Sequence, residues 1–314
     1  MINLAFSIFH PPFFIRYSLS VRWNKITLVG VGLLGGSLGL AVKHRKLARQ
    51  VAGYVRRKAS IKDCERVGAT DFTTDDLLAA VWDADLVILC TPLAQMRALV
   101  KQMLPALKRG AIVTDVGSVK GSVVKDIESL VSKAGAHFVG GHPMAGGEKS
   151  GVLASRADLF DSAICVLTPT RRTNRLALRK VEAFWKSLGA RLLCTTPEAH
   201  DEFVSRSSHL TYLVATTLAT TVLDPKLPKE QALLCAAGFR DTTRVASSSP
   251  EMWRDIALAN RKNLSRALEQ FIANARKFQQ ALAKSDAPAI EKYNATAKAR
   301  RDRWVAGLVS ASPQ

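Results

Sequence analysis

The chain has 314 residues, of which 47% are hydrophobic and 23% are charged, so it has enough apolar side chains for a substantial core and is not a largely disordered protein. Its length predicts about two domains. The net charge of +19 is compatible with nucleic acid, an anionic membrane surface or small acidic ligands, but the basic residues are spread along the chain and no apolar run is long enough to span a membrane.

The first 24 residues differ from the rest of the chain. Residues 1–14 are apolar and aromatic and include Pro11 and Pro12. No basic segment precedes them and no small-residue cleavage site follows, so they make a poor signal peptide, and they are too short and too interrupted by proline for a membrane span. We predict that residues 1–24 form a disordered extension or arise from a start codon placed upstream of the domain, and we assign them no function.

The cysteines indicate a reducing compartment. Five are present and none forms a CxxC pair. Four lie within or beside apolar runs, which is typical of buried thiols rather than of a disulfide framework or a zinc site. We therefore expect a cytoplasmic protein that holds no metal ion.

From residue 25 to residue 196, short apolar runs alternate with helical patterns. The predicted strands are 26–29, 51–55, 86–90, 111–116, 137–139, 163–167 and 191–194. The predicted helices are 33–44, 61–67, 93–107, 122–133 and 175–188. Strands that alternate with helices indicate an α/β fold with a parallel, doubly wound sheet.

After residue 196 only helical patterns follow, at 197–223, 229–237, 251–283 and 287–308. The sequence therefore predicts a doubly wound domain over 25–196 and an all-helical C-terminal domain over 197–314. The long apolar stripes of these helices need a surface to bury against. A second copy of the chain can provide that surface, so we predict a homodimer.

A glycine-rich turn follows the first predicted strand and begins a helix. Gly30 allows the tight turn, Gly32 lets the backbone approach a pyrophosphate, and Gly35 allows close packing of strand and helix. The backbone of Leu33 and Leu34 lies at the helix N-terminus, which stabilises negative charge. This pattern predicts a Rossmann-type dinucleotide site, to which we also assign Thr91 and Pro92 after the strand 86–90.

The end of the second strand favours NADP over NAD. An NAD site usually has an acidic residue here that binds the ribose 2′-hydroxyl, but this chain has Val55 followed by Arg56, Arg57 and Lys58. Guanidinium groups bind a 2′-phosphate well. We therefore expect Arg56 and Arg57 to contact NADP, while NAD remains possible if these cations form only a solvated turn.

A histidine in a second glycine-rich turn is the candidate catalytic base. His142 follows Gly140 and Gly141 after a short strand, and ligands of open α/β sheets bind at strand ends. Histidine also suits proton removal near neutral pH. Ser118, beyond the end of another strand, is placed to orient the imidazole or a substrate hydroxyl.

With these motifs in order, the chain resembles the prephenate/arogenate (cyclohexadienyl) dehydrogenases. The resemblance extends over nearly the whole chain from residue 25. It implies oxidative decarboxylation of prephenate, arogenate or both, with hydride transfer to NAD(P), in tyrosine biosynthesis. The matching stretches are GVGLLGGSLG at 30–39, DVGSVKG at 115–121, GGHPMAGGEKSG at 140–151, SHL at 208–210, GFRDTTR at 238–244 and MWRD at 252–255.

The resemblance also implies a role for each matching residue. His142 corresponds to the histidine that hydrogen-bonds the ring hydroxyl of the substrate, with Ser118 beside it, and Arg244 to an arginine that holds a substrate carboxylate. The other expected substrate-binding residues are His209, Glu148, Asp241 and Trp253.

Structural roles remain open for these residues. His209 and Trp253 are also compatible with packing in the core, and the two acidic residues with helix caps or surface positions. Arg244 is also compatible with an ion pair to Asp241.

One departure from the family pattern bears on the substrate. Relatives often have S-H-L-P-H where this chain has Tyr212 in place of the second histidine. Prephenate or arogenate preference and feedback by tyrosine therefore stay open.

Two rival interpretations predict other features. Another Rossmann dehydrogenase with a helical second domain, acting on a hydroxy acid or imine, would share the glycine turn but not the HPMAG and FRDTTR motifs together. A nucleic-acid-binding protein would need interleaved aromatic and basic residues or a reader motif, and the sequence has neither.

Overall fold

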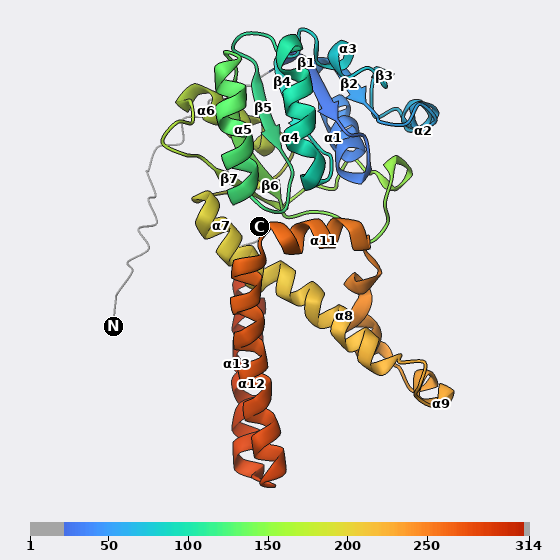
Figure 1. Ribbon diagram of the computed structural model, residues 1–314, viewed down its shortest axis with the longest axis vertical. Coiled ribbons are helices and arrows are strands. Elements are labelled where there is room, and N and C mark those ends of the chain that lie inside the picture. The colour runs from blue at the N-terminus through green and yellow to red at the C-terminus, as the bar shows by residue number, and fades with distance from the viewer. Residues whose placement is uncertain (1–21, 311–314) are drawn as a thin grey trace.

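The computed structural model describes residues 22–310, with a sheet domain above and a set of long helices below (Figure 1). The disordered extension predicted for residues 1–24 lies outside the described residues up to residue 21, and it is wrong for Trp23 and Asn24, which are in a strand. The first strand, β1 (Trp23–Val29), begins two residues before the predicted domain start. Trp23 is a buried core residue, which explains why the strand begins there.

In residues 22–310, eight strands form one sheet in the order β3-β2-β1-β4-β5-β6-β7-β8. Besides β1, the strands are β2 (Ala48–Tyr54), β3 (Phe72–Thr74), β4 (Leu86–Leu89), β5 (Ile112–Asp115), β6 (His137–Pro143), β7 (Ile164–Thr168) and β8 (Arg191–Cys194). The order reverses beside β1, as in doubly wound sheets, and the carboxyl ends of β1, β4 and β5 lie at one edge.

The sheet is parallel, as predicted, except at one pair of strands. β6 and β7 are antiparallel, with His142 opposite Val166. The segment between them contains only a short 3-10 turn, Val152–Ala154. Without a crossover helix the chain returns in the opposite direction. Strand β3 and helix α3 (Leu77–Val81) were also missed, since elements this short carry little periodicity.

Helices cover both faces of the sheet and form two buried clusters. One cluster contains the apolar sides of α1, α2 and α6, and the other those of α3, α4 and α5. The bounds are α1 (Leu33–His44), α2 (Ser60–Val67), α4 (Leu93–Met103), α5 (Gly121–Lys133) and α6 (Arg175–Ser187). The α/β class and the helical second half are confirmed.

The second half is helical but divided more finely than predicted. Its helices are α7 (Pro197–Val204), α8 (Leu210–Val222), α9 (Lys229–Leu233), α10 (Ala237–Thr243), α11 (Pro250–Ala259), α12 (Arg261–Ala283) and α13 (Ala287–Ser310). A π-helical segment, Ser205–His209, joins α7 to α8. The predicted helix 251–283 breaks at Asn260, whose buried side chain hydrogen-bonds the carbonyl of Asp201 instead of facing solvent.

Helices α12 and α13 pair as a hairpin that projects away from the sheet (Figure 1). Only Ala267 of α12 is buried, and apolar side chains such as Phe271, Ile272 and Trp304 are exposed. Apolar faces of this kind usually mark an interaction surface. Between residues 22 and 310, no helix has the length and apolar character needed to cross a membrane.

Candidate active site

The glycine turn has the geometry of a pyrophosphate cradle. Gly30 has φ +100°, and a Cβ there would lie 2.8 Å from the methyl carbon of Thr91. A Cβ on Gly35 would lie 2.1 Å from the Gly30 carbonyl oxygen, so strand and helix pack in direct contact. Space is open above Gly32, where no atom lies within 4 Å of an added Cβ.

The surroundings of this turn also suit a dinucleotide. The backbone of Leu33 and Leu34 forms the first turn of α1, which has no side-chain cap, so its amides are free to bind an anion. Thr91 and Pro92 lie between β4 and α4. The Thr91 hydroxyl is buried and has no hydrogen-bond partner among the described residues, so a ligand atom would satisfy it.

Arg56 and Arg57 lie in the exposed turn between β2 and α2, beside this cradle. Val55 precedes them, buried, and its amide donates to the Thr74 carbonyl at 3.0 Å. The Val55 side chain offers no acceptor to a ribose hydroxyl. The turn that carries the two arginines follows β2, the strand after which the adenosine ribose of a dinucleotide binds in this fold. Their contact with a cofactor remains a prediction.

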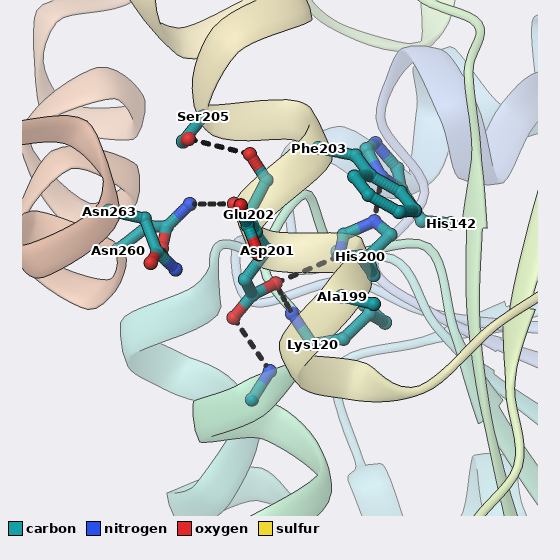
Figure 2. Close-up of polar contacts among 12 residues, drawn as sticks. Lys120, His142, Ala199, His200, Asp201, Glu202, Phe203, Ser205, Asn260 and Asn263 are labelled. Atoms are coloured by element: carbon teal, nitrogen blue, oxygen red, sulfur yellow. Dashed lines mark hydrogen bonds and ion pairs between the residues drawn. The ribbon is translucent and has the colours of Figure 1, made fainter. Parts of the chain in front are cut away.

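His142 lies at the end of β6 and contacts a second histidine. Its Nδ1 is 2.8 Å from Nε2 of His200 on α7, and Nδ1 of His200 is 2.8 Å from Oδ1 of Asp201. Figure 2 shows the three side chains in a row. All three are buried. Since Nδ1 of His142 faces His200, its Nε2 is the atom left to meet a substrate.

Asp201 is anchored by backbone amides at the start of α5. Its Oδ1 accepts from the Lys120 amide at 2.7 Å, and its Oδ2 from the Gly121 amide at 2.8 Å. The carboxylate thus stabilises the N-terminus of α5. These hydrogen bonds also connect the helical half to the sheet domain near His142.

A buried ion pair hydrogen-bonds the backbone at the end of β6. The Lys120 ammonium pairs with Asp115 at the end of β5 and donates to the Gly141 carbonyl at 2.8 Å. Asp115 in turn accepts from the Gly141 amide at 3.1 Å. Burial lowers the pKa of Lys120, and the Asp115 carboxylate opposes that shift. These contacts fix the backbone next to His142.

The environment keeps His142 neutral. Burial lowers its pKa well below the usual value, and the nearby His200, Lys120 and His209 lower it further. A neutral imidazole can accept a proton, as a general base requires.

His209 presents an unsatisfied donor to the same region. Its Nδ1 lies 3.2 Å from Nδ2 of Asn260, so the ring hydrogen falls on Nε2, which is buried without a partner in residues 22–310. Burial lowers the pKa of His209 to about 4, while Asp201 opposes that shift. The Ser118 backbone lies close enough to the ring to raise the pKa as well, but it makes no hydrogen bond of normal geometry to Nε2. A buried N–H without an acceptor costs about 1–3 kcal/mol, which a ligand oxygen would relieve.

Trp253 lies on the same side of the site. Its ring stacks on Tyr212 at 3.8 Å and meets His209 edge-on at 6.0 Å. Its Nε1 is a second buried donor that has no partner within the described chain. The structure therefore brings Trp253 together with His209, as expected, and adds Tyr212 to them.

Arg244 forms an ion pair with Glu148, and not with Asp241. Arg244 begins the 3-10 turn after α10, and Glu148 lies in the loop after β6, so the pair connects the two halves of the chain. A pocket beside the glycine turn is lined by Leu33 and Glu148, among others. Asp241 is exposed on α10, and its role as a substrate ligand remains a prediction.

Ser118 lies in the loop between β5 and α5, and its backbone is close to the His209 ring. The expected contact of its side chain with His142 or a substrate hydroxyl remains a prediction.

The sequence did not point to His200, Asp201 or Asn260. His200 and Asp201 are adjacent residues in the first turns of a helix, where a histidine followed by an acidic residue is an ordinary pattern. Asn260 falls inside what looked like an uninterrupted helix. The weak signal available was a polar Asn within an apolar stripe, which often marks a buried hydrogen bond.

Two family models match the chain. The model "Prephenate dehydrogenase, nucleotide-binding domain" matches residues 38–194. The model "Prephenate dehydrogenase, dimerization domain" matches residues 196–296. The boundary between the two models lies directly after β8, the last strand.

Individual proteins are similar over most of the chain. A prephenate dehydrogenase of Bacillus subtilis is 35% identical over 281 residues, which are 89% of this chain and 76% of that protein. A cyclohexadienyl dehydrogenase of Zymomonas mobilis is 34% identical over 282 residues, covering 88% and 95%. The crystal structure of the A. aeolicus prephenate dehydrogenase with hydroxyphenyl propionate and NAD+ has a TM-score of 0.83 at 32% identity, covering 89% of this chain and 98% of that one.

Proposed function

Because the chain belongs to the prephenate dehydrogenase family, we propose that it oxidatively decarboxylates prephenate, arogenate or both, with hydride transfer to a nicotinamide dinucleotide. The observation that carries the proposal is the placement of His142. A neutral, buried imidazole with a free Nε2 lies at the edge of the sheet where the glycine turn also lies. A rival hydroxy-acid or imine dehydrogenase does not account for both family models.

The proposed reaction combines hydride transfer, proton transfer and loss of carbon dioxide. A nicotinamide dinucleotide held at the glycine turn would accept the hydride of the ring carbon that bears the hydroxyl. His142 Nε2 takes the hydroxyl proton, and the ring carboxylate then leaves as carbon dioxide while its bonding electrons enter the ring. The proton returns from His142 to the phenolate oxygen that results. General-base assistance of this kind contributes roughly 10²–10⁴ in rate.

The substrate carries two carboxylates, and the site offers donors for them. The Arg244 guanidinium provides a bidentate partner, and the unsatisfied N–H groups of His209 and Trp253 provide single ones. We assign these three residues to substrate binding and Ser118 to the hydroxyl, with Glu148 and Asp241 near the entrance. Cytoplasmic localisation stays a prediction.

We expect NADP to be preferred over NAD because of Arg56 and Arg57. A charge-assisted hydrogen bond contributes about 1.5–3 kcal/mol, so even one bond to the 2′-phosphate predicts roughly tenfold in kcat/KM. The measurement is kcat/KM for both cofactors with prephenate and with arogenate. This assay also tests the proposed function, which fails if neither substrate is turned over.

The Arg56→Ala/Arg57→Ala variant should lose the NADP preference. Arg171→Ala/Arg172→Ala is the matched control, since it removes an adjacent exposed arginine pair from the turn after β7. An NAD preference in the wild type, or an NADP preference that survives in the double variant, would show that this turn does not select the cofactor.

We further propose that the helical half forms a homodimer. The exposed apolar side chains of α12 and α13 support this, together with the dimerization-domain match. Sedimentation at micromolar concentration should give twice the 34.1 kDa chain mass. Phe271→Glu on α12 should shift the equilibrium toward monomer, whereas Leu176→Glu, on an exposed position of α6, should not. A wild-type monomer would contradict the proposal.

A further inference from the structure

We propose that His200 and Asp201 are positioning residues that fix which nitrogen of His142 carries the hydrogen, so that its Nε2 meets the substrate hydroxyl as an acceptor. The inference rests on the proposed function, because it explains how His142 acts as the base. Figure 2 shows the side chains of Asp201, His200 and His142 in a row, joined by hydrogen bonds.

The row begins at Asp201, whose hydrogen-bonding role is fixed. Backbone amides can only donate, and those of Lys120 and Gly121 donate to its Oδ1 and Oδ2 at 2.7 and 2.8 Å. The carboxylate is therefore an acceptor on both oxygens. Since Oδ1 also lies 2.8 Å from Nδ1 of His200, that nitrogen carries a hydrogen and donates.

The position of the hydrogen on His200 determines its position on His142. A neutral imidazole has one N–H and one lone pair. With its hydrogen on Nδ1, His200 offers a lone pair at Nε2, which lies 2.8 Å from Nδ1 of His142. Nδ1 of His142 therefore donates, and the lone pair of His142 falls on Nε2. That is the tautomer that a base needs.

The Asp201 carboxylate has partners for its charge besides His200. It faces the N-terminus of α5, a helix of 13 residues, and interacts with the Lys120 ammonium as well. The hydrogen bonds of the row are therefore complete with a single hydrogen on each imidazole. Burial lowers the pKa of His142 most, and Lys120 from the loop before α5 and His209 from the π-helical segment lower it further.

A charged His200 would have the opposite consequence. It would donate from Nε2 to Nδ1 of His142 and force the hydrogen of His142 onto the nitrogen that meets the substrate. His142 would then be a donor and would not take the hydroxyl proton. The two arrangements differ in the position of one hydrogen, which makes them distinguishable by experiment.

The direct test is the tautomeric state of the free enzyme. Nitrogen NMR on ¹⁵N-histidine-labelled protein near neutral pH reports which ring nitrogen carries the hydrogen, and the signals are assigned by comparison with His142→Asn and His200→Gln. We expect the Nδ1–H form for both His142 and His200. An Nε2–H form of His142, or a charged His200, would overturn the proposal.

Variants test the consequence for turnover. His200→Leu removes the acceptor for His142 and should lower kcat by at least about tenfold, with little change in KM for the cofactor. His200→Gln has a carbonyl acceptor and an amide donor, so it should retain several times more activity than His200→Leu. Equal activity of these two variants, or wild-type turnover in His200→Leu, would overturn the proposal.

Asp201→Ala supplies an independent test of the first member of the row. It removes the acceptor that holds the hydrogen of His200 on Nδ1, so kcat should fall and the NMR signals of His142 should no longer show the Nδ1–H form alone. The control is Asp126→Ala, which removes an exposed carboxylate from α5. A His142 that stays wholly in the Nδ1–H form in folded Asp201→Ala would contradict the proposal. If the wild type turned over neither substrate, the proposed function would fail while the NMR result still decided the tautomer.

Discussion

Replacing His142 with asparagine is expected to lower kcat by at least about 100-fold, with KM for the cofactor nearly unchanged. Asparagine keeps a polar side chain of similar size but cannot take a proton from the ring hydroxyl. The glycine turn that binds the dinucleotide is a separate element, so cofactor binding should survive. Steady-state kinetics with each substrate varied in turn separates the two effects.

The pH dependence provides a second check on the same residue. The pKa of His142 is lowered well below its usual value, chiefly by burial. The neutral form is the base, and a lowered pKa means that this form already predominates at pH values below the ordinary histidine range. In the wild type, kcat/KM should therefore stay level through neutral pH and decline only as the pH falls through that lowered pKa.

His137→Asn is the matched control, since it makes the same substitution at the other end of strand β6. It should leave both kcat and the pH profile close to those of the wild type. Near-normal turnover in His142→Asn would end the assignment of His142 as the base. A wild-type profile that declines at an ordinary histidine pKa or above it would contradict the lowering of the His142 pKa by burial.

Much of the fold follows from local pattern. The helix predicted at 33–44 has the same bounds in the structure, because its glycine turn and its apolar stripe specify its start and its length. The direction of β7 could not be predicted, since it depends on how the chain returns after β6. The break at Asn260 was also missed, because the apolar pattern continues across it and only its tertiary partner Asp201 explains it.

The residues of the site also fall into those that local sequence predicts and those that depend on tertiary contacts. His142 and the glycine turn are recognisable because their turns have characteristic local sequences. His200 acts through a contact with a residue 58 positions away, which arises only when α7 docks on the sheet. The Arg244–Glu148 pair likewise joins two distant segments. The sequence identified both residues, but the alternative ion pair that it left open for Arg244 was with Asp241, which is near in sequence.

Replacing Arg244 with alanine is expected chiefly to raise KM for the cyclohexadienyl acid. A carboxylate that loses a guanidinium partner in a binding site costs about 2–5 kcal/mol. Arg244 is substantially exposed, and solvent screens exposed charges, so we expect the lower end of that range, roughly 30-fold in KM. The decrease in kcat should be smaller, because the proton and hydride transfers do not pass through this residue.

Two further variants separate substrate binding from the ion pair with Glu148. Glu148→Gln breaks the pair but keeps the guanidinium, and a substrate carboxylate no longer competes with Glu148 for it, so KM should be unchanged or lower. Arg240→Ala removes the same charge from an exposed position on α10, four residues earlier, and should leave KM unchanged. If Arg244→Ala leaves KM unchanged, Arg244 serves only to hold the two halves together. If Arg240→Ala raises KM as much as Arg244→Ala does, the effect belongs to the general positive charge of this segment and not to a carboxylate bound at Arg244.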